Sequence, residues 1–266
     1  INTLLPVGPA LAGRIMGKRV VYHYHENAFV KGTFYKVLAT IMQKLAHKII
    51  CVSEYQASFL QQKKCVITVP NALPQNFVNR LTPNFQAAFK RKHILMLGSL
   101  KLYKSPLEFI ELTKRLPQFI FVLVINDTKE NINIFIKEYK INISKNLTIY
   151  PQQNDVVPFY NQTSLVLNLS NKKQFVETFG LTALEAMSAG LPVIVPTEGG
   201  IAEMVVDGEN GYKIDVQNLN QIAECIKTIL SDETLYMELA QNALAYSKRF
   251  SEAKMVNSIE MILNRK

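Results

Sequence analysis

Hydrophobic positions along the chain follow two different periods. Short runs of β-branched and aromatic residues predict buried strands, and apolar residues spaced three and four apart predict helices between them. The predicted strands cover residues 19–23, 48–52, 66–69, 94–97, 119–125, 147–150, 165–169, 193–195 and 212–214. The predicted helices cover residues 33–46, 54–61, 106–115, 132–140, 181–189, 201–206, 219–230 and 233–250. This alternation predicts an α/β fold with parallel sheets covered on both faces.

A polar stretch over residues 74–90, which contains Pro83, separates two groups of these elements. The first group has about three strands and the second about six, which is enough for a complete doubly wound sheet. We therefore expect a first domain over 1–85 and a second over 86–250. Because the first domain has only about half the strands of such a sheet and the chain begins with Ile1, we expect a partial domain whose earlier strands precede residue 1.

The lengths of the apolar runs and the spacing of the cysteines indicate the cellular compartment of the protein. The longest apolar run, residues 119–125, is far shorter than the roughly 20 residues that span a bilayer. The chain does not start with a charged and then apolar signal peptide. No C-x-x-C pair occurs, and isolated thiols are typical of a reducing compartment; they are Cys51, Cys65 and Cys225. We expect a cytoplasmic protein.

Positive charge is concentrated in the first third of the chain. Residues 1–92 contain thirteen lysines and arginines and two acidic residues, Glu26 and Glu54, whereas residues 93–266 have a net charge of −2. A basic domain attracts nucleic acid, an anionic membrane or a phosphorylated substrate. Composition alone does not choose among these, but it predicts that the two parts of the chain have different partners.

The segment that starts at Glu177 carries the strongest chemical pattern. Glu177 lies just before a predicted helix and Glu185 about two turns inside it, a separation of roughly 10 Å. This span suits the two ends of a nucleotide diphosphate sugar. Unpaired backbone N–H groups at the helix start favour phosphate, here at Phe179, Gly180 and Leu181. The alternative interpretation is that Glu177 complements the helix dipole and Glu185 is an ordinary solvated residue.

The rest of this segment resembles the signature of glycosyltransferase family 4, the retaining enzymes with the GT-B double-Rossmann fold. The family has two glutamates around a Phe-Gly-Leu, followed by Glu-Ala-Met, small-Gly-x-Pro-Val, Gly-Gly-x-x-Glu and an Asp-Gly-x-Asn-Gly turn. The corresponding positions here are Glu177, 179–181, 185–187, 189–193, 199–203 and 207–211. The match covers about 35 continuous residues in register.

The resemblance implies a role for each of these positions. Glu177 would contact the hydroxyls of the donor sugar as a catalytic residue, and Glu185 would hold the ribose. The diphosphate would be bound by the backbone amides of Gly180 and Leu181. Backbone would approach the donor closely, as it does where glycine lies near a ligand, at Gly199 and Gly200.

A second loop joins the first strand of the second domain to a helix, which is the usual phosphate position of a Rossmann unit. The family has Gly-Arg-Leu here, then a lysine and a glycine. Gly98 and Lys104 fit this pattern, whereas Ser99 stands in place of the arginine and Ser105 in place of the glycine. We expect Gly98, Ser99 and Lys104 to bind the donor, with Lys101 as a candidate to compensate for the arginine. The alternative is that Lys104 is a solvated loop charge.

A third region ends the first predicted strand with His23-Tyr24-His25-Glu26-Asn27. Side chains at the carboxyl end of a strand lie where α/β proteins bind ligands. The segment resembles the family's first-domain histidine loop, which implies that His25 faces the transferred sugar as a second catalytic residue, with His23 as the alternative. A structural role is the competing interpretation.

The positive charge of the first domain suggests what this domain could bind. Its first predicted helix and the following residues carry a stripe with a period of four: Lys36, Thr40, Lys44 and Lys48. Such a stripe is either a solvated face or a contact with anionic lipid headgroups, at roughly 1 kcal/mol per basic residue. Family members often use lipid-linked or lipopolysaccharide acceptors, so the resemblance implies that residues 1–92 face the inner side of the cell membrane. No nucleic-acid-binding module accompanies the charge, and nucleic acid is not expected.

Sequence motifs for other chemistries are absent. The chain has no Asp-x-Asp, no Walker loop, no G-x-G-x-x-G and no Cys/His cluster with zinc spacing. We expect neither a metal site nor a cofactor, because amides, a helix dipole and Lys104 can stabilise a departing diphosphate.

These observations combine into one prediction. We expect a GT-B-type enzyme that moves a sugar from a nucleotide diphosphate sugar to an acceptor hydroxyl with retention, in bacterial surface polysaccharide or lipopolysaccharide synthesis. The final segment, residues 251–266, is expected to form a helix that crosses back to the first domain, as in the family. Two alternatives stay open: a non-catalytic fragment that binds a nucleotide sugar, and a structural protein at a lipid surface.

Overall fold

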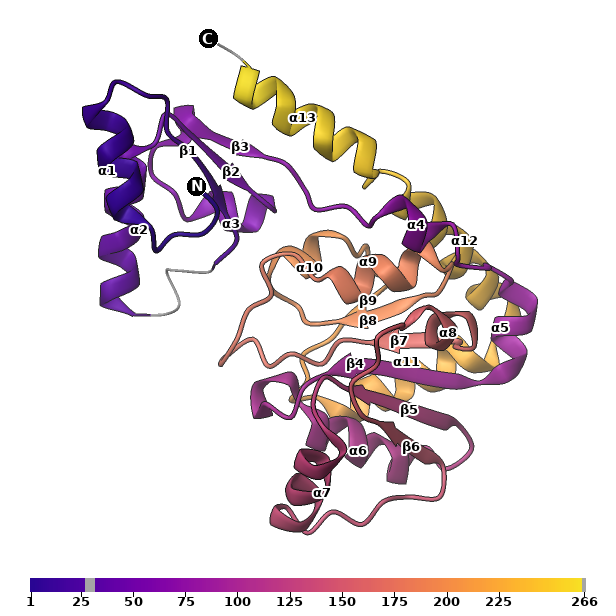
Figure 1. Cartoon of the computed structure of the whole chain (residues 1–266). Coiled ribbons are helices and arrows are strands. Elements are labelled where there is room, and N and C mark those ends of the chain that lie inside the picture. The colour runs from indigo at the N-terminus through magenta and orange to yellow at the C-terminus, as the bar shows by residue number, and fades with distance from the viewer. Residues whose placement is uncertain (27–31, 265–266) are drawn as a thin grey trace.

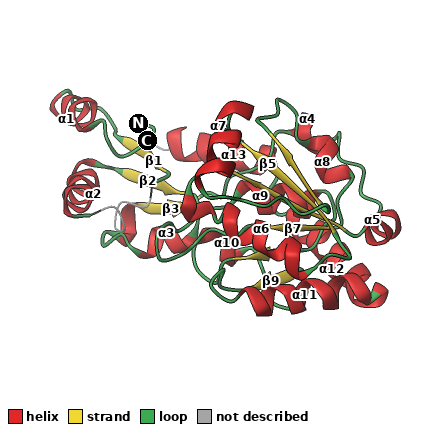
Figure 2. Cartoon of the chain, turned by 90° about the horizontal axis from the view of Figure 1, so that it is seen from below, coloured by secondary structure: helices red, strands yellow, loops and turns green. Residues whose placement is uncertain are grey.

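The computed structural model describes residues 1–26 and 32–264 and contains two parallel β-sheets (Figure 1). Three strands form the first sheet in the order β1-β2-β3, and six form the second in the order β6-β5-β4-β7-β8-β9. Helices lie on both sides of the second sheet (Figures 1 and 2). The predicted α/β fold with parallel sheets is therefore confirmed.

The first sheet has a small core of its own. Its strands and helices are α1 (Val7–Ile15), β1 (Val21–Tyr24), α2 (Thr33–Leu45), β2 (Lys48–Cys51), α3 (Glu54–Ser58), the 3-10 turn η1 (Lys63–Cys65) and β3 (Val66–Thr68). Tyr22 and Tyr24 of β1 are completely buried with Ala39 and Met42 of α2. Alternate residues of a strand point to the same side, so this face of β1 is the one that packs on the helices.

The second sheet lies within the larger core. Its strands are β4 (His93–Gly98), β5 (Ile120–Ile125), β6 (Leu147–Tyr150), β7 (Leu165–Leu167), β8 (Val193–Val195) and β9 (Gly211–Lys213). Strands β7 and β8 are buried at every position, as expected for central strands covered on both faces. The ends of all nine predicted strands agree with the structure within two residues.

Helices connect these strands or follow the last of them. They are the 3-10 turn η2 (Leu102–Lys104), α6 (Pro106–Arg115), α7 (Lys129–Glu138), α8 (Val157–Asn161), α9 (Leu181–Ser188), α10 (Gly200–Glu203), α11 (Leu219–Ser231) and α12 (Glu233–Ser247). Several begin with a short polar side chain that accepts a backbone N–H bond: Thr128, Asn218 and Asp232. Among the described helices, none combines the length and hydrophobicity needed to cross a bilayer.

Several helices were not predicted. They are α1, α8, α4 (Gln75–Val78) and α5 (Phe85–Arg91). The predicted helix over 233–250 ends earlier, at Ser247, and the helix predicted within residues 251–266 is α13 (Glu252–Asn264). Helix α5 lies inside the stretch predicted to be a polar linker. Its start is capped by Asn84, and Phe89 packs against Tyr236 of α12, with ring centroids 5.3 Å apart. The local periodicity of the sequence cannot predict this contact, because the two segments lie far apart in the chain.

Helix α13 lies against the first sheet, although it follows the second sheet in the chain (Figure 1). Ile262 is buried with Ile50 and Val69. The guanidinium of Arg19 donates hydrogen bonds to the carbonyl oxygens of Ile262 and Leu263, at 2.5 and 3.1 Å. The end of the chain therefore contributes to the packing of the first sheet. Two residues of the predicted C-terminal segment lie outside the described residues, Arg265 and Lys266.

The strand order of the second sheet reverses between β4 and β7. The chain runs outward from β4 through β5 to β6 and then returns to place β7 on the other side of β4. Connections that leave two neighbouring strands in opposite directions open a crevice at their carboxyl ends. This arrangement places a candidate ligand site at the ends of β4 and β7.

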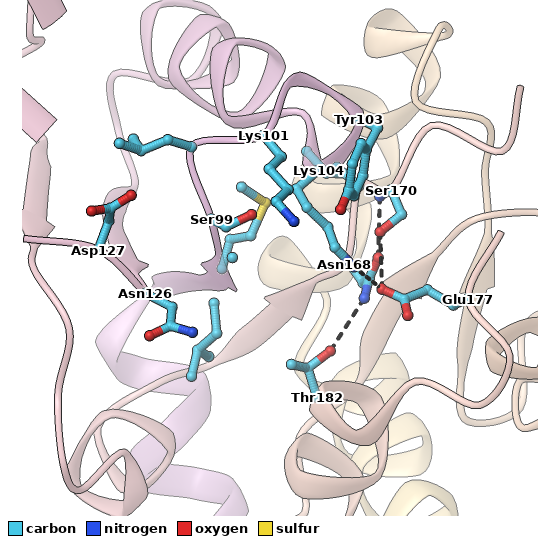
Figure 3. A pocket seen from close by; sticks show the side chains of 15 residues that line it. Ser99, Lys101, Tyr103, Lys104, Asn126, Asp127, Asn168, Ser170, Glu177 and Thr182 are labelled. Atoms are coloured by element: carbon cyan, nitrogen blue, oxygen red, sulfur yellow. Dashed lines mark hydrogen bonds and ion pairs between the residues drawn. The ribbon is translucent and has the colours of Figure 1, made fainter. Parts of the chain in front are cut away.

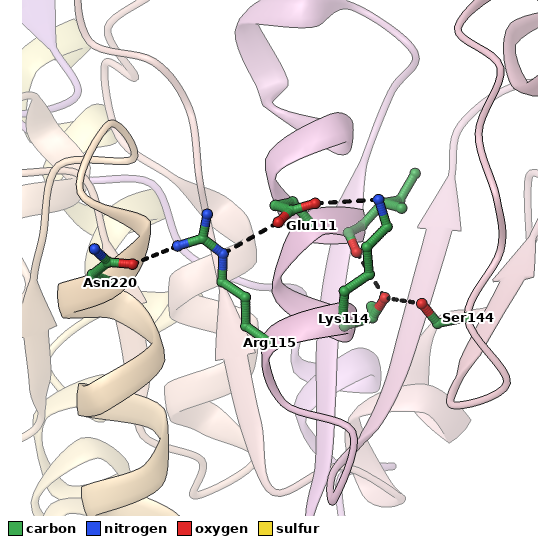
Figure 4. Close-up of polar contacts among 7 residues, drawn as sticks. Glu111, Lys114, Arg115, Ser144 and Asn220 are labelled. Atoms are coloured by element: carbon green, nitrogen blue, oxygen red, sulfur yellow. Dashed lines mark hydrogen bonds and ion pairs between the residues drawn. The ribbon is translucent and has the colours of Figure 1, made fainter.

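Polar contacts hold α6 beside α11 (Figure 4). Arg115 of α6 donates to Asn220 of α11 at 2.6 Å, and its guanidinium lies 3.4 Å from the carboxylate of Glu111. Lys114 also pairs with Glu111, at 3.2 Å. These side chains are largely exposed, so each ion pair is expected to contribute little to stability.

Ser105, directly before α6, has a left-handed backbone with φ of 56° and ψ of 46°. This conformation costs a non-glycine residue about 1 kcal/mol or more. The side chain is completely buried, and its hydroxyl has no hydrogen-bond partner among the described residues. Glycine, which the family pattern has at this position, would avoid both costs.

Replacing Ser105 with glycine should raise the melting temperature by about 2–4 °C, because about 1 kcal/mol of backbone strain is removed. Thermal unfolding followed by circular dichroism measures this shift. Ser247→Gly is the matched control, because Ser247 is a buried serine in the last turn of α12, and it should lower the melting temperature. If the Ser105→Gly variant is no more stable than the wild type, the left-handed backbone at Ser105 does not lower the stability of the protein.

Candidate functional site

A cavity of about 770 Å³ opens at the carboxyl edge of the second sheet, at the reversal between β4 and β7. The loops after β4, β5 and β7 and the first turn of α9 line it. Among the lining residues are Gly98, Ser99, Lys101, Tyr103, Lys104, Asn126, Asp127, Asn168, Ser170, Glu177 and Thr182. A cavity of this size suits a ligand of several rings.

Lys104 and Glu177 form an ion pair in this cavity (Figure 3). The exposed fractions of the two side chains are only 23% and 16%. The hydroxyl of Ser170 donates a second hydrogen bond to the Glu177 carboxylate at 3.2 Å. The structure therefore brings together two of the predicted site residues, one basic and one acidic, from segments more than 70 residues apart.

Two aromatic rings lie beside this ion pair. Tyr103 and Phe175 stack with ring centroids 4.7 Å apart, and the ammonium of Lys104 lies 4.4 Å from the centroid of Phe175. The N–H of Asn171 donates to the carbonyl of Tyr103 at 2.8 Å. These contacts join the loop after β4 to the loop before α9. The cation and the carboxylate are therefore held in place by the same set of contacts.

Several polar residues of the cavity were not predicted from the sequence, among them Asn126, Asp127, Asn168 and Thr182. Asn126 and Asp127 directly follow β5, and Asn168 directly follows β7 and hydrogen-bonds to Thr182 of α9 at 3.2 Å. Polar residues directly after a strand are a usable signal. The missing information was that β5 and β7 both flank β4, which the order of the strands in the chain does not reveal.

Gly180 is the N-cap residue of helix α9 and has a left-handed backbone with φ of 91°. A Cβ atom there would lie 2.5 Å from the side chain of Ile201, so glycine is required. Leu181 is exposed, whereas Phe179 is buried and its ring centroid lies 5.8 Å from that of Phe250. The side chain of Phe179 therefore belongs to the core, and only its backbone is left to meet a ligand.

Gly199 and Gly200 pack against the backbone that carries Glu177. The N–H of Gly200 donates to the Glu177 carbonyl at 2.8 Å. A Cβ at Gly200 would lie 1.9 Å from the carbonyl oxygen of Thr178, and one at Gly199 would lie 2.5 Å from that of Glu177. The close backbone approach at these glycines is therefore between two loops of the protein, and it determines where Glu177 lies.

The segment 198–203 also contacts helix α3 of the first sheet. The carboxylate of Glu203 accepts hydrogen bonds from the backbone N–H groups of Glu54, at 3.1 Å, and Tyr55. The hydroxyl of Tyr55 donates to Glu198 at 2.8 Å. Burial raises the pKa of Glu203, although the two N–H bonds oppose the rise. One short segment thus touches the backbone of Glu177 on one side and α3 on the other.

Glu185 is not among the residues that line the cavity. It lies one turn after Thr182 on α9 and accepts a hydrogen bond from the hydroxyl of Tyr160 on α8. Burial raises the pKa of Glu185, and the bond from Tyr160 opposes the rise. The ionised carboxylate is therefore less stable here than in water.

The two predicted histidines lie at the end of β1, and neither lines the cavity. The ring centroids of His23 and His25 are 4.0 Å apart. Burial lowers the pKa of His23 to about 4, helped by the neighbouring His25. Burial also lowers the pKa of His25, although Glu26 opposes the change. Both rings are therefore neutral at pH 7. Asn27, which ends the predicted histidine loop, lies outside the described residues.

Metal-binding and thiol chemistry find little support in the structure. Across residues 1–26 and 32–264, no three or more histidine, cysteine, aspartate and glutamate side chains gather in a way that could hold a metal ion. Burial raises the pKa of both Cys51 and Cys225 to about 12. Such thiols are not ionised at neutral pH and behave as packing residues.

A family model described as "Glycosyl transferases group 1" matches residues 80–246, more than half of the chain. The chain belongs to this family. The matched region contains the residues that line the cavity, and Glu185 as well. The predicted family is therefore confirmed at the level of group 1 glycosyltransferases, and the site lies in the part that the family shares.

Individual relatives agree with this result. N-acetyl-alpha-D-glucosaminyl L-malate synthase of Bacillus anthracis is 30% identical over 142 residues, which is 53% of this chain and 36% of the relative. A glycosyltransferase of Haemophilus influenzae is 23% identical over 257 residues, 92% of this chain and 69% of the relative. HepE of Anabaena, solved with UDP and glucose, has a TM-score of 0.82 at 21% identity, over 98% of this chain and 75% of that one. The fold is therefore that of a GT-B glycosyltransferase, and the matched part spans about a third of the malate synthase.

Glu185→Gln should raise thermal stability at neutral pH. The pKa of Glu185 in the folded protein is above the value of about 4.3 that it has in the unfolded chain. The protonated carboxyl therefore contributes fully to the free energy of unfolding below about pH 4.3, and this contribution is lost as the pH rises through the folded pKa. Glutamine removes this loss and keeps an oxygen for the Tyr160 hydroxyl. We expect a gain of about 1–3 °C at pH 7.5 that falls to nearly zero at about pH 4, measured by differential scanning calorimetry.

Glu111→Gln is the matched control. Lys114 and Arg115 lower the pKa of Glu111, so removal of its charge should give no gain at pH 7.5. An equal gain in the two variants, or a gain in Glu185→Gln that does not depend on pH, would show that the burial of the charge is not the cause.

Proposed function

We propose that the protein transfers a sugar from a nucleotide diphosphate sugar to an acceptor hydroxyl, with retention of the anomeric configuration. The observation that carries this proposal is the Lys104–Glu177 ion pair beside the start of α9, in a cavity large enough for such a donor. Membership of the group 1 family and the UDP and glucose bound to HepE support the same class of ligand.

The donor is proposed to lie along α9. Glu177 contacts the hydroxyls of the sugar ring, and Glu185 holds the ribose. The backbone amides of Gly180 and Leu181 meet the diphosphate at the positive end of the helix dipole. The loop after β4 closes the other side of the donor with Gly98, Ser99 and Lys104.

The proposed reaction passes through a transition state with oxocarbenium character, as other glycosyl transfers do. Negative charge develops on the departing diphosphate. Preorganised amides and lysines stabilise such a charge without any reorganisation during the reaction. The proposal therefore assigns no divalent ion and no cofactor to this step.

The acceptor is proposed to approach from the first sheet. His25, neutral at pH 7, faces the transferred sugar as a hydrogen-bonding group. Phe34 and Val37 of α2 are exposed beside Lys36, which is consistent with contact between the basic residues of 1–92 and an anionic lipid surface; Lys31 of this set lies outside the described residues. We propose a glycan or lipid-linked acceptor in bacterial surface polysaccharide or lipopolysaccharide synthesis, at the cytoplasmic face of the membrane.

Calorimetric titration with UDP, GDP and ADP, followed by hydrolysis and transfer assays with their sugars, tests the proposal. Glu177→Gln should bind the nucleotide diphosphate within about threefold of the wild type but lose about 100-fold in transfer rate, because its contacts strengthen in the transition state. Glu185→Ala should weaken nucleotide binding about tenfold, because a hydrogen-bonding carboxylate is lost. Transfer should be unchanged when EDTA is added.

Glu209→Gln is the control, because Glu209 is exposed and lies outside the cavity. It should leave both binding and transfer unchanged. Binding without any transfer or hydrolysis would favour the non-catalytic fragment. Absence of binding to all three nucleotides, with liposome association that Glu177→Gln does not alter, would favour the structural protein.

A further inference from the structure

We infer that Tyr160 is a positioning residue, whose hydroxyl orients the Glu185 carboxylate toward the ribose hydroxyls of the donor. This inference rests on the proposed function, in which Glu185 holds the ribose, and adds to it a residue of α8 that touches no ligand. Tyr160 is buried and does not line the cavity, so it can act on the donor only through Glu185.

Glu185 lies beside the cavity along α9. Thr182 lines the cavity in the first turn of this helix, and Glu185 follows three residues later. Residues three apart lie on the same side of a helix, about 4.5 Å from each other along its axis. The ribose of a nucleotide follows directly after its phosphates. A ribose next to Glu185 is therefore compatible with a diphosphate at the start of α9.

The contact with Tyr160 fixes one oxygen of this carboxylate. The Tyr160 hydroxyl donates to Oε2 of Glu185, whereas Oε1 accepts no hydrogen bond in the described part of the chain. The ring of Tyr160 is held in turn by Phe77 of α4, which packs edge-on against it with ring centroids 6.4 Å apart. The carboxylate is thus oriented from behind, and Oε1 and one lone pair of Oε2 are left for hydroxyl donors.

The same bond favours the charged form of Glu185. Burial raises the pKa of Glu185, and the bond from Tyr160 is the interaction that lowers it. Strands β7 and β8, which pack against α9, carry no ionisable side chain. Among the buried residues of α12, which also packs against α9, only Tyr236 is ionisable. The ionised carboxylate accepts hydrogen bonds from both ribose hydroxyls, so Tyr160 supports the form that binds.

A structural role alone does not require this pair. Tyr236 is buried in the same core, and its hydroxyl donates to the backbone carbonyl of Ser164 at 2.8 Å, without any carboxylate. The Tyr160 hydroxyl instead meets a carboxylate whose charge is disfavoured by burial. A pair that lowers stability in this way is expected where the residue is retained for a ligand.

Affinities for ribonucleotides and for 2′-deoxyribonucleotides separate this role from a structural one. UDP, GDP, ADP and their 2′-deoxy forms are titrated calorimetrically into the wild type and Tyr160→Phe, which keeps the ring and its packing. Tyr160→Phe should weaken the ribonucleotide that the wild type binds about tenfold, and its 2′-deoxy form less than about threefold. The loss should be largest at about pH 6 and shrink toward about pH 9, because without the bond Glu185 has a higher pKa and ionises only at higher pH.

Two further variants complete the test. In the Glu185→Ala background, Tyr160→Phe should change the affinity less than about twofold, because no carboxylate is left to position. Tyr236→Phe is the matched control, since it removes another buried tyrosine hydroxyl, and it should keep the wild-type affinity for both forms at every pH.

The outcomes distinguish this inference from the proposed function. If the wild type binds a ribonucleotide and Tyr160→Phe binds it equally well, or weakens both forms to the same extent, the inference is wrong and the proposed donor binding stands. The inference is also wrong if the effect of Tyr160→Phe persists in the Glu185→Ala background. If the wild type binds none of the three diphosphates, both the inference and the proposed function are wrong.

Discussion

The hydrogen bond from the Gly200 amide to the Glu177 carbonyl holds the loop before α9 against the loop after β8. No other residue type fits at Gly199 or Gly200, because a Cβ atom would overlap the backbone of Glu177 or Thr178. The position of Glu177 fixes in turn the ion pair with Lys104, and α9 starts only four residues later, at Leu181. A contact without any charged group thus determines where the charged groups of the site lie.

Sequence reasoning succeeded where information was local. The nine strands have strong β periodicity, and the residues from Glu177 to Gly200 form a continuous pattern with glycines whose need the structure now explains sterically. Sequence reasoning failed where a helix or a site depends on contacts between segments far apart in the sequence. Helix α5 depends on Phe89 packing against Tyr236. Asn126 and Asn168 share a cavity only because β5 and β7 both lie close to β4, on its two sides.

Two features that reduce stability lie near the cavity. Burial disfavours the charge of Glu185, and Ser105 combines a left-handed backbone with an unpaired buried hydroxyl among the described residues. The core of the second sheet is apolar by comparison, as the buried runs of β7 and β8 show. Local departures from the most stable choice are expected where a residue is retained for a ligand and not for packing.

The hydrogen bonds from Glu203 to the first turn of α3 couple the loop that holds Glu177 to the first sheet. Glu203 lies on the segment whose glycines hold Glu177, while its carboxylate is bound to backbone N–H groups of the first sheet's helix. Separation of the two sheets would therefore break these hydrogen bonds and act on the loop that holds Glu177. The position of Glu177 is thus coupled to the contact between the two sheets, so under the proposed function a molecule with separated sheets would be poorly arranged to react with its donor. Protection of a reactive donor would then need no separate lid.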